Sequence, residues 1–590
     1  MYLREFTIKN FRNLEELHLQ FNQGVNVLIG ENNSGKSSVV DALRICLSHG
    51  EYDRDIYIRR SDYYIDNTNP DAELPKIEFD LFFEIEDPME AGWFRDLLVQ
   101  NEDGSQELQM HHRYYYETVN DVEKRRRKIW GGEHEGQQIE SDVLDLFKQV
   151  YLGALRDAVQ ELRPVRGNKL GELFSKLKYD SEGNEITDEK RDELSDQIRT
   201  ALHENEHWEN LIDSGLTKVN DHLDKTSIKG KEQEVEIDFL PFEFRKLVDY
   251  LRIQIPVFDA EIIQGDQSKQ KYFDLFQNGL GYNNLIYTAT VLGDLKVIKE
   301  VEPEKFIALI IEEPEAHLHP QLQNIFFDYL SKLDNQGFQL FITSHSPTLT
   351  AKADLDSLII LQNQNKTVSS FTIIESPLEP KNKKYLSKFL DVTKSQLFFS
   401  NGVILVEGIS EVLLLQIFSE LIGENKEFSL EKKGVEIVNI NGVAFEHFAK
   451  LFNDEDEKKR LQNKCSIITD DDRHTQTGEK RAQKALDLKS GNLDVFLAEK
   501  TFEIELFKAS EENREILLEI FSDLHPTASK RIEEGTSIDD YAMSFLSKIE
   551  SNKAKSELAH TLAIKLEEDH ELRNKFTVPD YIDRAIKWLF

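Results

Sequence analysis

The sequence lacks the features that would point to an oxidising compartment or to a membrane. Only two of its 590 residues are cysteines, Cys46 and Cys465, which lie far apart and outside any metal-ligand spacing. This excludes a disulfide framework and a cysteine-based metal site. No apolar run approaches the ~20 residues that cross a bilayer. Residues 1–13 also lack the apolar stretch of a secretory signal. We therefore expect a cytoplasmic protein with no membrane contact.

Basic residues are also scarce. The chain has 72 Lys and Arg against 109 Asp and Glu, which gives a net charge of −37. Because phosphate contacts need Lys and Arg, this balance argues against a protein that coats nucleic acid nonspecifically. It does not exclude local basic surface. The one dense basic run is KRRRK, Lys124 to Lys128, which is either a solvated face or a nucleic-acid contact.

The chain has no internal repeat, and its length exceeds what one hydrophobic core holds. Apolar periodicity predicts three strands, a loop and a helix over residues 1–50, and another strand after Pro75. Residues 165–240 are polar with helical spacing, which predicts a helical insertion that could serve oligomerisation. Strands alternate with helices over 250–375. A link over 376–384 then leads into a second α/β series.

The segment GENNSGKS, Gly30 to Ser37, matches GxxxxGK[ST] between a predicted strand and a predicted helix. Glycines let the backbone fold round phosphates, whose charge the amide N–H groups and the helix N-terminus favour. Lys36 should reach the β- and γ-phosphates, and the Ser37 hydroxyl should ligate Mg²⁺. The residues expected to hold nucleotide here are Gly30, Asn33, Gly35, Lys36, Ser37 and Ser38.

Two adjacent acids end a second apolar segment far along the chain. Six apolar residues (306–311) precede Glu312 and Glu313, as in a buried central strand that delivers carboxylates to a ligand. Glu312 would lie near Mg²⁺, and Glu313 would orient or deprotonate the attacking water. The alternative is a solvated turn. The wide gap from the Gly-rich loop indicates one ATPase core opened by a long insertion.

Two weaker segments fit the same site. The predicted strand in QLFITSHSP (339–347) leads to His345, a candidate γ-phosphate sensor, although an isolated His after a strand is more often structural. The loop QNGLGYNNLIY (277–287) places Gly279 and Gly281 at the start of a helix. Such a helix N-terminus can contact a phosphate, here one bound by a second subunit.

A separate group of acids follows two later strands. The apolar run in GVILVEG (402–408) leads to Glu407, and Glu411 follows in a predicted helix. The apolar run in CSIITDDDR (465–473) leads to three aspartates, Asp470 to Asp472. In an extended segment Asp470 and Asp472 point to one side and Asp471 to the other. Like charges so close are costly unless cations neutralise them, and oxygen ligands favour Mg²⁺, Mn²⁺ or Ca²⁺. Such a site suits phosphodiester hydrolysis; the alternative is solvated strand ends.

These motifs together resemble a known family. The FRNL segment before the Gly-rich loop, EEPEAHLHP and TSHSP are similar to the ATPases of the OLD (overcoming lysogenization defect) family and their SMC- and ABC-like relatives. EGxxE followed by DxD resembles the Toprim fold of OLD nucleases, including the nuclease subunits of Gabija-type anti-phage systems. Wider ABC relatives have Asp where this chain has Glu312. The resemblance implies ATP held between two head domains, and hence a homodimer or larger assembly.

Two late segments extend the resemblance. KTFEIELF (500–507) is similar to the segment that supplies a further metal-site acid, for which we select Glu503 over Glu505. KAKSELAHTLA (553–563) resembles the helix with a catalytic lysine, which we place at Lys555, with Lys553 as the alternative. A lysine there would stabilise charge on the scissile phosphate.

The fold class we predict is α/β: an ABC/SMC-like P-loop ATPase with a helical insertion, followed by a Toprim α/β domain with helical additions. The expected domains are the N-terminal ATPase part (1–165), a helical insertion with a possible dimerisation role (166–250), the C-terminal ATPase part (251–390) and the Toprim nuclease domain (391–590). The predicted activity is ATP-regulated DNA cleavage, with anti-phage defence implied by the family. The expected cofactors are ATP with one Mg²⁺ and two Mg²⁺ or Mn²⁺ in the Toprim site.

Other functions stay open at this point. The chain could be an ABC-type ATPase that acts as a DNA clamp or assembly platform with an inert Toprim domain. A topoisomerase- or primase-like enzyme is a further alternative, but no segment reads as the tyrosine-bearing domain or the zinc ribbon that these need. Beyond DNA and a second copy, a helicase-like protein is the other partner that the resemblance suggests.

Overall fold

The structure is a computed structural model that describes residues 1–49, 56–65, 73–102, 104–120, 122–154, 158–180, 182–226, 235–237, 242–258, 262, 267–335, 337–364, 366–423, 426–442, 444–471 and 478–590. It divides into two compact units. Unit 1 comprises Met1–Asp145, Ala308–Glu315 and Pro320–Phe590, and unit 2 comprises Leu146–Ile307 and Ala316–His319. Within the described ranges, no helix combines the length and the apolar character needed to span a bilayer.

Unit 1 begins with a mainly antiparallel sheet in the order β2-β1-β4-β6-β5, with β7 also paired to β6. Alternate residues of β4 are buried, as the period of a half-buried strand requires. The predicted strand after Pro75 is therefore confirmed. The bounds are β1 (Tyr2–Phe11), β2 (Leu14–Gln20), β4 (Ile77–Glu84), β5 (Leu98–Gln100), β6 (Gln106–Val119) and β7 (Val122–Gly131).

The nucleotide-site sheet of unit 1 has the order β14-β13-β3-β12-β11. Strands β13, β3, β12 and β11 run parallel, and β14 is antiparallel to β13. Every residue of β12 is buried, as expected for a central strand covered on both faces. The bounds are β3 (Val25–Gly30), β11 (Phe306–Glu312), β12 (Gln339–Ser344), β13 (Leu358–Gln364) and β14 (Thr367–Thr372).

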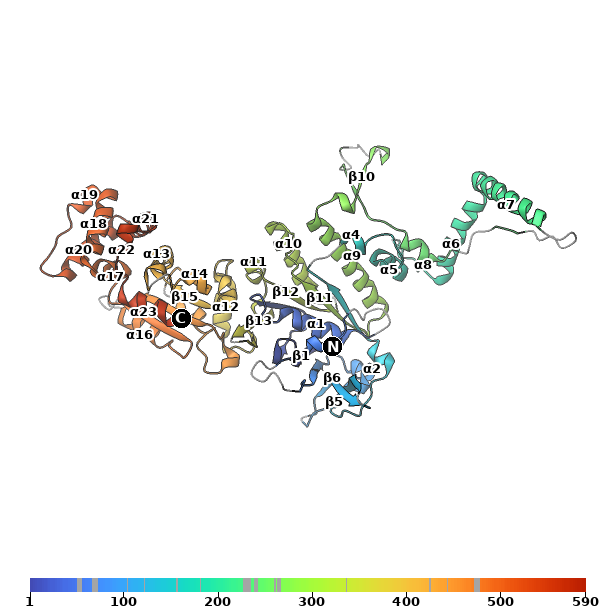
Figure 1. Cartoon of the computed structure of the whole chain (residues 1–590), viewed down its shortest axis with the longest axis horizontal. Coiled ribbons are helices and arrows are strands. Elements are labelled where there is room, and N and C mark those ends of the chain that lie inside the picture. Colours follow the sequence, from blue (N-terminus) through green and yellow to red (C-terminus); the bar gives the residue numbers. More distant parts are fainter. Residues whose placement is uncertain are drawn as a thin grey trace. The chain divides into compact units, whose positions relative to one another are not determined.

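The sheet of the predicted Toprim domain in unit 1 is parallel throughout, in the order β16-β15-β17-β18. Strand β15 is labelled among the helices of this domain in Figure 1. One apolar core joins β15 and β17 to helices α13, α17, α18, α20, α21 and α23. The strand bounds are β15 (Gly402–Val406), β16 (Val435–Asn439), β17 (Lys464–Asp470) and β18 (Leu493–Ala498). The helices of unit 1 are α1 (Lys36–Leu47), α2 (Pro88–Trp93), α3 (Ser141–Leu144), α10 (Pro320–Ser331), α11 (Pro347–Thr350), α12 (Pro380–Phe389), α13 (Ile409–Leu421), α14 (Leu430–Lys433), α15 (Phe445–Ala449), α16 (Gly478–Leu486), α17 (Phe502–Lys508), α18 (Glu511–Leu524), α19 (Pro526–Ser529), α20 (Ile538–Ser551), α21 (Lys555–Glu568), α22 (His570–Lys575) and α23 (Asp580–Leu589).

The expected link over 376–384 is shorter than predicted. Helix α12 already starts at Pro380, because proline fits the first position of a helix, where its missing N–H is not needed. The three strands, loop and helix predicted over residues 1–50 are confirmed as β1, β2, β3 and α1.

Unit 2 is largely helical. Helix α5 packs against α8 and α9, and Lys176 of α5 pairs with Asp294 of α9 at 2.8 Å. Helix α7 is the outermost helix of this unit in Figure 1. The bounds are β8 (Phe147–Leu152), α4 (Ala158–Glu161), α5 (Lys169–Lys176), α6 (Asp188–His203), α7 (Glu206–Thr226), α8 (Phe244–Asp249), β9 (Gln254–Pro256), β10 (Tyr272–Asp274) and α9 (Leu280–Val301).

Candidate functional site

The Gly-rich loop connects β3 to α1 in the way the sequence predicts. Gly30, Asn33 and Gly35 have φ angles of 150°, 65° and 97°, a backbone that glycine adopts most easily. At Gly30 an added Cβ would also lie 2.2 Å from the Leu361 carbonyl oxygen. The loop therefore curls back over the start of α1, as a phosphate cradle does.

Lys36 is held inside this loop. Its Nζ donates to the carbonyl oxygens of Gly30 (2.8 Å) and Glu31 (2.7 Å), and its side chain is buried. Burial lowers the pKa of Lys36 to about 8, although nearby carboxylates, chiefly Glu313, oppose the shift. A polyanionic phosphate would offset this desolvation. Ser37 is exposed at the same loop, whereas the Ser38 hydroxyl is turned to the Asn13 side chain at 2.8 Å.

Parallel pairing brings the second motif to the same sheet edge. Strand β12 lies between β3 and β11, and Glu312 at the end of β11 is paired with Thr343. Glu313 follows in a left-handed conformation (φ 43°). Its carboxylate lies 3.7 Å from the Nε2 atom of His345. The structure thus brings Lys36, Glu313 and His345 to one edge, and their predicted roles remain predictions.

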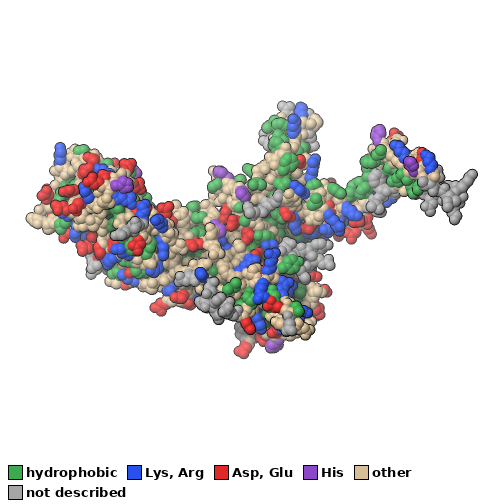
Figure 2. Space-filling view, viewed as in Figure 1, with side chains coloured by type: hydrophobic (Ala, Val, Ile, Leu, Met, Phe, Trp, Pro, Cys, Tyr) green, Lys and Arg blue, Asp and Glu red, His purple; other side chains and the backbone are tan. Residues whose placement is uncertain are grey.

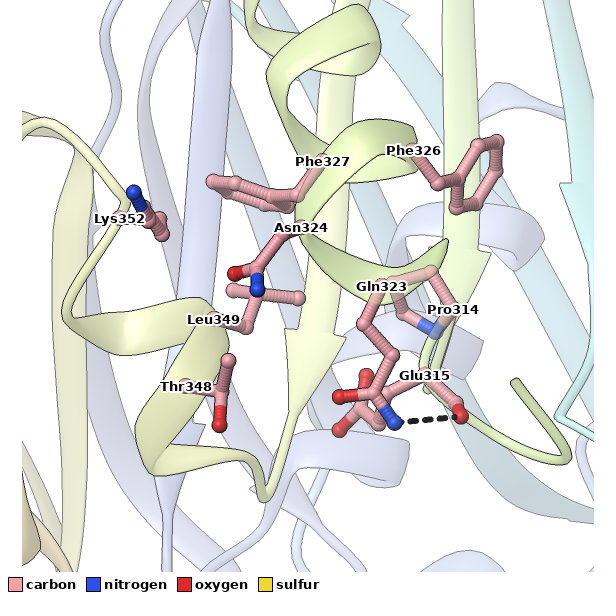
Figure 3. A pocket seen from close by; sticks show the side chains of 9 residues that line it. All are labelled: Pro314, Glu315, Gln323, Asn324, Phe326, Phe327, Thr348, Leu349 and Lys352. Carbon is pink, nitrogen blue, oxygen red and sulfur yellow. Dashed lines mark hydrogen bonds between the residues drawn. The ribbon is translucent and has the colours of Figure 1, made fainter. Parts of the chain in front are cut away.

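Glu315 is a site residue that the sequence reasoning missed. Its Oε1 atom accepts from the Ser344 hydroxyl (2.7 Å) and the His345 N–H (3.0 Å). Burial raises the pKa of Glu315. It also lines a small pocket between α10 and α11, where Gln323 donates to its carbonyl oxygen (Figure 3). The sequence signal that could have identified Glu315 is its place as the third acid of EEPEAH (312–317). Its carboxylate fixes the backbone at His345.

Gly281 has a packing role in unit 2. An added Cβ would lie 2.5 Å from the His317 carbonyl oxygen, so a larger residue would displace that backbone. Gly279 is the N-cap of α9, and a Cβ there would meet nothing within 4 Å. The proposed contact with a phosphate of a second subunit remains a prediction.

The Toprim acids also lie at strand ends. Strands β15 and β17 are neighbours, so Glu407 and Asp470 emerge beside each other. The Oε1 atom of Glu407 accepts from the Thr469 hydroxyl and from the Asp470 N–H, the latter at 3.1 Å. The Oδ1 atom of Asp470 accepts from the Phe502 N–H at 3.0 Å. Thr469, which the sequence analysis did not single out, therefore positions Glu407.

Glu411 lies in the first turn of α13 and is 8% exposed. Its pKa is raised to about 7, first because it is buried and then because Glu503 and Glu407 are negatively charged nearby. Carboxylates whose charges oppose one another in this way are those that a divalent cation would stabilise.

Lys555 is the first residue of α21 and lies beside a buried acid. Its Nζ is 3.2 Å from the Glu503 carboxylate, which is 6% exposed, and 3.2 Å from Glu550. Burial alone would lower the pKa of Lys555, but these two carboxylates outweigh it and raise the pKa. Glu505 instead accepts from the Glu499 N–H, and Lys553 is exposed.

The chemistry of the candidate metal ligands in the Toprim site fits a divalent cation. All the candidate ligands are carboxylates, as Mg²⁺ and Mn²⁺ prefer. Among the described residues no three acidic, His or Cys side chains stand at metal-ligand distances. Glu407 and Asp470 accept hydrogen bonds from protein groups, and Glu503 pairs with Lys555. Asp472 lies outside the described residues. A further polar group in this region, the buried Tyr581 hydroxyl, was also missed by the sequence analysis.

The comparisons with known proteins agree with this arrangement. A family model described as an AAA ATPase domain matches residues 1–350. The chain belongs to this ATPase family. A second model, described as the TOPRIM domain of overcoming lysogenization defect-like proteins, matches residues 398–472, which confirms the predicted resemblance to the OLD family. These two domains imply the use of a nucleotide and of a divalent metal.

Several relatives carry names that describe a nuclease. The chain is 27% identical over 367 residues to "Endonuclease GajA" of Bacillus cereus, a match that covers 55% of this chain and 48% of that protein. It is 24% identical over 455 residues to "OLD nuclease" of Thermus scotoductus, covering 75% and 78%. The solved C-terminal region of the Burkholderia pseudomallei OLD protein has 21% identity and a TM-score of 0.25, covering 32% of this chain and 97% of that one. The chain thus spans about half the length of the first of these relatives.

Proposed function

We propose that the protein is an ATP-regulated, divalent-metal-dependent DNA endonuclease of the OLD type. The observation that carries the proposal is the group of carboxylates at the ends of β15 and β17, near the buried Glu411 and the buried Glu503 that pairs with Lys555. This site occurs in one chain with a P-loop. Relatives with the names endonuclease and nuclease support the reaction type, and the resemblance to the OLD family implies a role in anti-phage defence.

In this proposal Glu407, Glu411, Asp470, Asp472 and Glu503 would hold two Mg²⁺ or Mn²⁺ ions. Bound cations of this kind activate water and stabilise the leaving oxygen in phosphodiester hydrolysis. Thr469 and the Asp470 N–H fix the orientation of Glu407. Lys555 would keep its proton beside Glu503, so it can stabilise charge that develops on the scissile phosphate.

At the nucleotide site, Lys36 and the loop N–H groups would hold the ATP phosphates, with Gly30, Asn33, Gly35 and Ser38 shaping the loop. Ser37 and Glu312 would face one Mg²⁺. Glu313 would orient the attacking water, and His345, 3.7 Å from it, would sense the γ-phosphate.

The basic run supplies a surface for DNA. Residues 122–128 of β7 are all exposed, and alternation along the strand places Lys124, Arg126 and Lys128 on one face. Tyr115 of β6 is paired with Arg126, and the Lys128 Nζ lies 5.9 Å from its ring centroid. Figure 2 shows Lys and Arg side chains interspersed with Asp and Glu over the visible face of the molecule.

Arg126 and Lys128 are paired with Glu117 and Glu135 in this surface. Exposed ion pairs of this kind contribute only ~0–1 kcal/mol, so phosphates can replace both carboxylates. In a chain with a net charge of −37, such a strand is a suitable contact for a DNA backbone.

The helical insertion supplies a surface for a second copy. Helix α7 has no buried residue among those described. Trp208, Leu211 and Val219 are 42%, 61% and 44% exposed and fall on one stripe at helical spacing. We therefore propose the insertion (166–250) as a dimerisation element alongside the ATPase heads. The triple variant Trp208→Glu, Leu211→Glu, Val219→Glu should lower the mass measured by light scattering; an unchanged mass would exclude this role.

We also propose the domain boundaries, the location of the protein and one further partner. The ATPase parts (1–165 and 251–390) and the Toprim domain (391–590) are our proposed boundaries. A cytoplasmic location is proposed from the composition, and a helicase-like partner is carried over from the family resemblance; co-purification from the native host would test the partner.

The deciding experiment is cleavage of plasmid and linear DNA with Mg²⁺ or Mn²⁺, with and without ATP, comparing the wild type with Asp470→Ala. Loss of cleavage in the variant would establish the nuclease, and the ATP comparison would show whether nucleotide activates or restrains it. ATP hydrolysis without cleavage under every condition would favour the DNA clamp with an inert Toprim domain.

A further inference from the structure

Tyr581 is the second residue of α23 and is 4% exposed. Within the described part of the chain, its hydroxyl oxygen is buried without a hydrogen-bond partner. A buried, unpaired polar group costs free energy that phenylalanine in the same space would avoid. The hydroxyl therefore destabilises the fold unless something that binds to the protein uses it.

The surroundings of this side chain indicate what that would be. Helix α23 packs against β17 and β18, and β17 ends at Asp470. The charges that act on the phenol are those of Asp470, Glu411, Glu505 and Glu503. Burial, followed by these four carboxylates, raises the pKa of Tyr581 well above its usual value. The phenol thus keeps its proton and stays a donor on a helix that packs against β17 and β18.

Another buried tyrosine provides a comparison. The Tyr63 hydroxyl is also buried without a partner among the described residues, in a side chain that is 1% exposed. The groups that act on Tyr63 include Tyr116, Arg125 and Glu123, none of which belongs to the Toprim acids. The two tyrosines therefore share the unpaired hydroxyl and differ in what surrounds it.

We propose that Tyr581 is a positioning residue of the Toprim metal site, whose hydroxyl donates to a carboxylate oxygen when a divalent cation draws these acids together. The proposal rests on the metal-dependent function proposed above. A carboxylate that ligates a metal through one oxygen leaves the other free to accept, and groups that hold ligands in this way typically change metal affinity by about 10–100-fold.

The test is Mn²⁺ binding to the full-length chain without nucleotide, measured by titration calorimetry, for wild type, Tyr581→Phe and Tyr63→Phe. We expect Tyr581→Phe to weaken Mn²⁺ binding by roughly 10–100-fold. Its melting temperature without metal should be unchanged or higher, because an unpaired hydroxyl has been removed. Tyr63→Phe should leave the affinity for Mn²⁺ unchanged.

Three results would overturn the proposal. Wild-type affinity in Tyr581→Phe would show that the hydroxyl does not act on the metal site. A lower melting temperature of that variant without metal would show that the hydroxyl has a structural partner. If the wild type itself bound no Mn²⁺, the metal-dependent function would fail together with the proposal, so the two failures are distinguishable.

Discussion

The nucleotide site and the Toprim site both lie at the carboxyl ends of parallel strands, yet they bury charges of opposite sign. In the first, Lys36 is surrounded by carbonyl oxygens, and burial lowers its pKa to about 8. In the second, Glu411 is buried near other carboxylates, and its pKa rises to about 7. Each site holds a charge that is costly without its ligand, so the first is suited to a polyanion and the second to cations.

The largest effect should come from removing the buried cation. Lys36→Ala should lower ATP hydrolysis by roughly 100- to 1000-fold, the usual result of losing one preorganised charge-stabilising group. Circular dichroism should show an intact fold. Lys384→Ala, on the exposed face of α12, is the control for general loss of charge. Persistent hydrolysis in a clean preparation of Lys36→Ala would refute the assignment of the nucleotide site.

The lysine of the Toprim site tests the other half of the comparison. Lys555→Ala should reduce DNA cleavage by roughly 100-fold without weakening Mn²⁺ binding, because it removes a positive charge 3.2 Å from Glu503. Cleavage rates and titration calorimetry measure the two effects. Lys553→Ala is a matched control two residues away and should cleave normally; the reverse pattern would move the role to Lys553.

The buried acid should make the metal-free protein sensitive to pH. Because the folded state raises the pKa of Glu411 from 4.5 to about 7, it holds this proton more tightly than the unfolded chain. The free energy of unfolding should therefore fall as pH rises from about 4.5 to about 7, by up to roughly 3 kcal/mol, and level off above.

Urea denaturation in EDTA between pH 5 and pH 8 measures this slope. Glu411→Gln should flatten it, whereas Glu511→Gln, on the exposed start of α18, should not. Added Mn²⁺ should restore wild-type stability above pH 7. Equal slopes in the wild type and in Glu411→Gln would contradict the assignment of the burial cost to this residue.

The smallest effect should come from removing charges that are already exposed to solvent. A triple variant with Lys124→Gln, Arg126→Gln and Lys128→Gln tests this. Its plot of log K for DNA binding against the logarithm of salt concentration should be shallower by about 0.9 per lost phosphate contact. Fluorescence anisotropy at several salt concentrations measures this slope. The matched control is a triple variant of exposed lysines elsewhere, with Lys384→Gln, Lys388→Gln and Lys432→Gln. The same slope in both triple variants would exclude β7 from the DNA contact.

The positions of the two candidate sites along the chain follow from local patterns in the sequence. An apolar run followed by a glycine loop or by paired acids is a local pattern, because the carboxyl end of a buried strand is where the chain reaches solvent. Lys36, Glu312, Glu407 and Asp470 are therefore candidates that the sequence alone predicts.

Which distant groups come together in a site follows from the packing of strands and helices, and no local pattern predicts it. The pairing of β12 between β3 and β11 brings His345 to Glu313, and the packing of α21 brings Lys555 to Glu503. Thr469 and Tyr581 had no sequence signal that set them apart, because a hydroxyl acquires a role only from the atoms that packing places beside it. Burial, which raises the pKa of Glu411 and lowers that of Lys36, is a property of the folded chain.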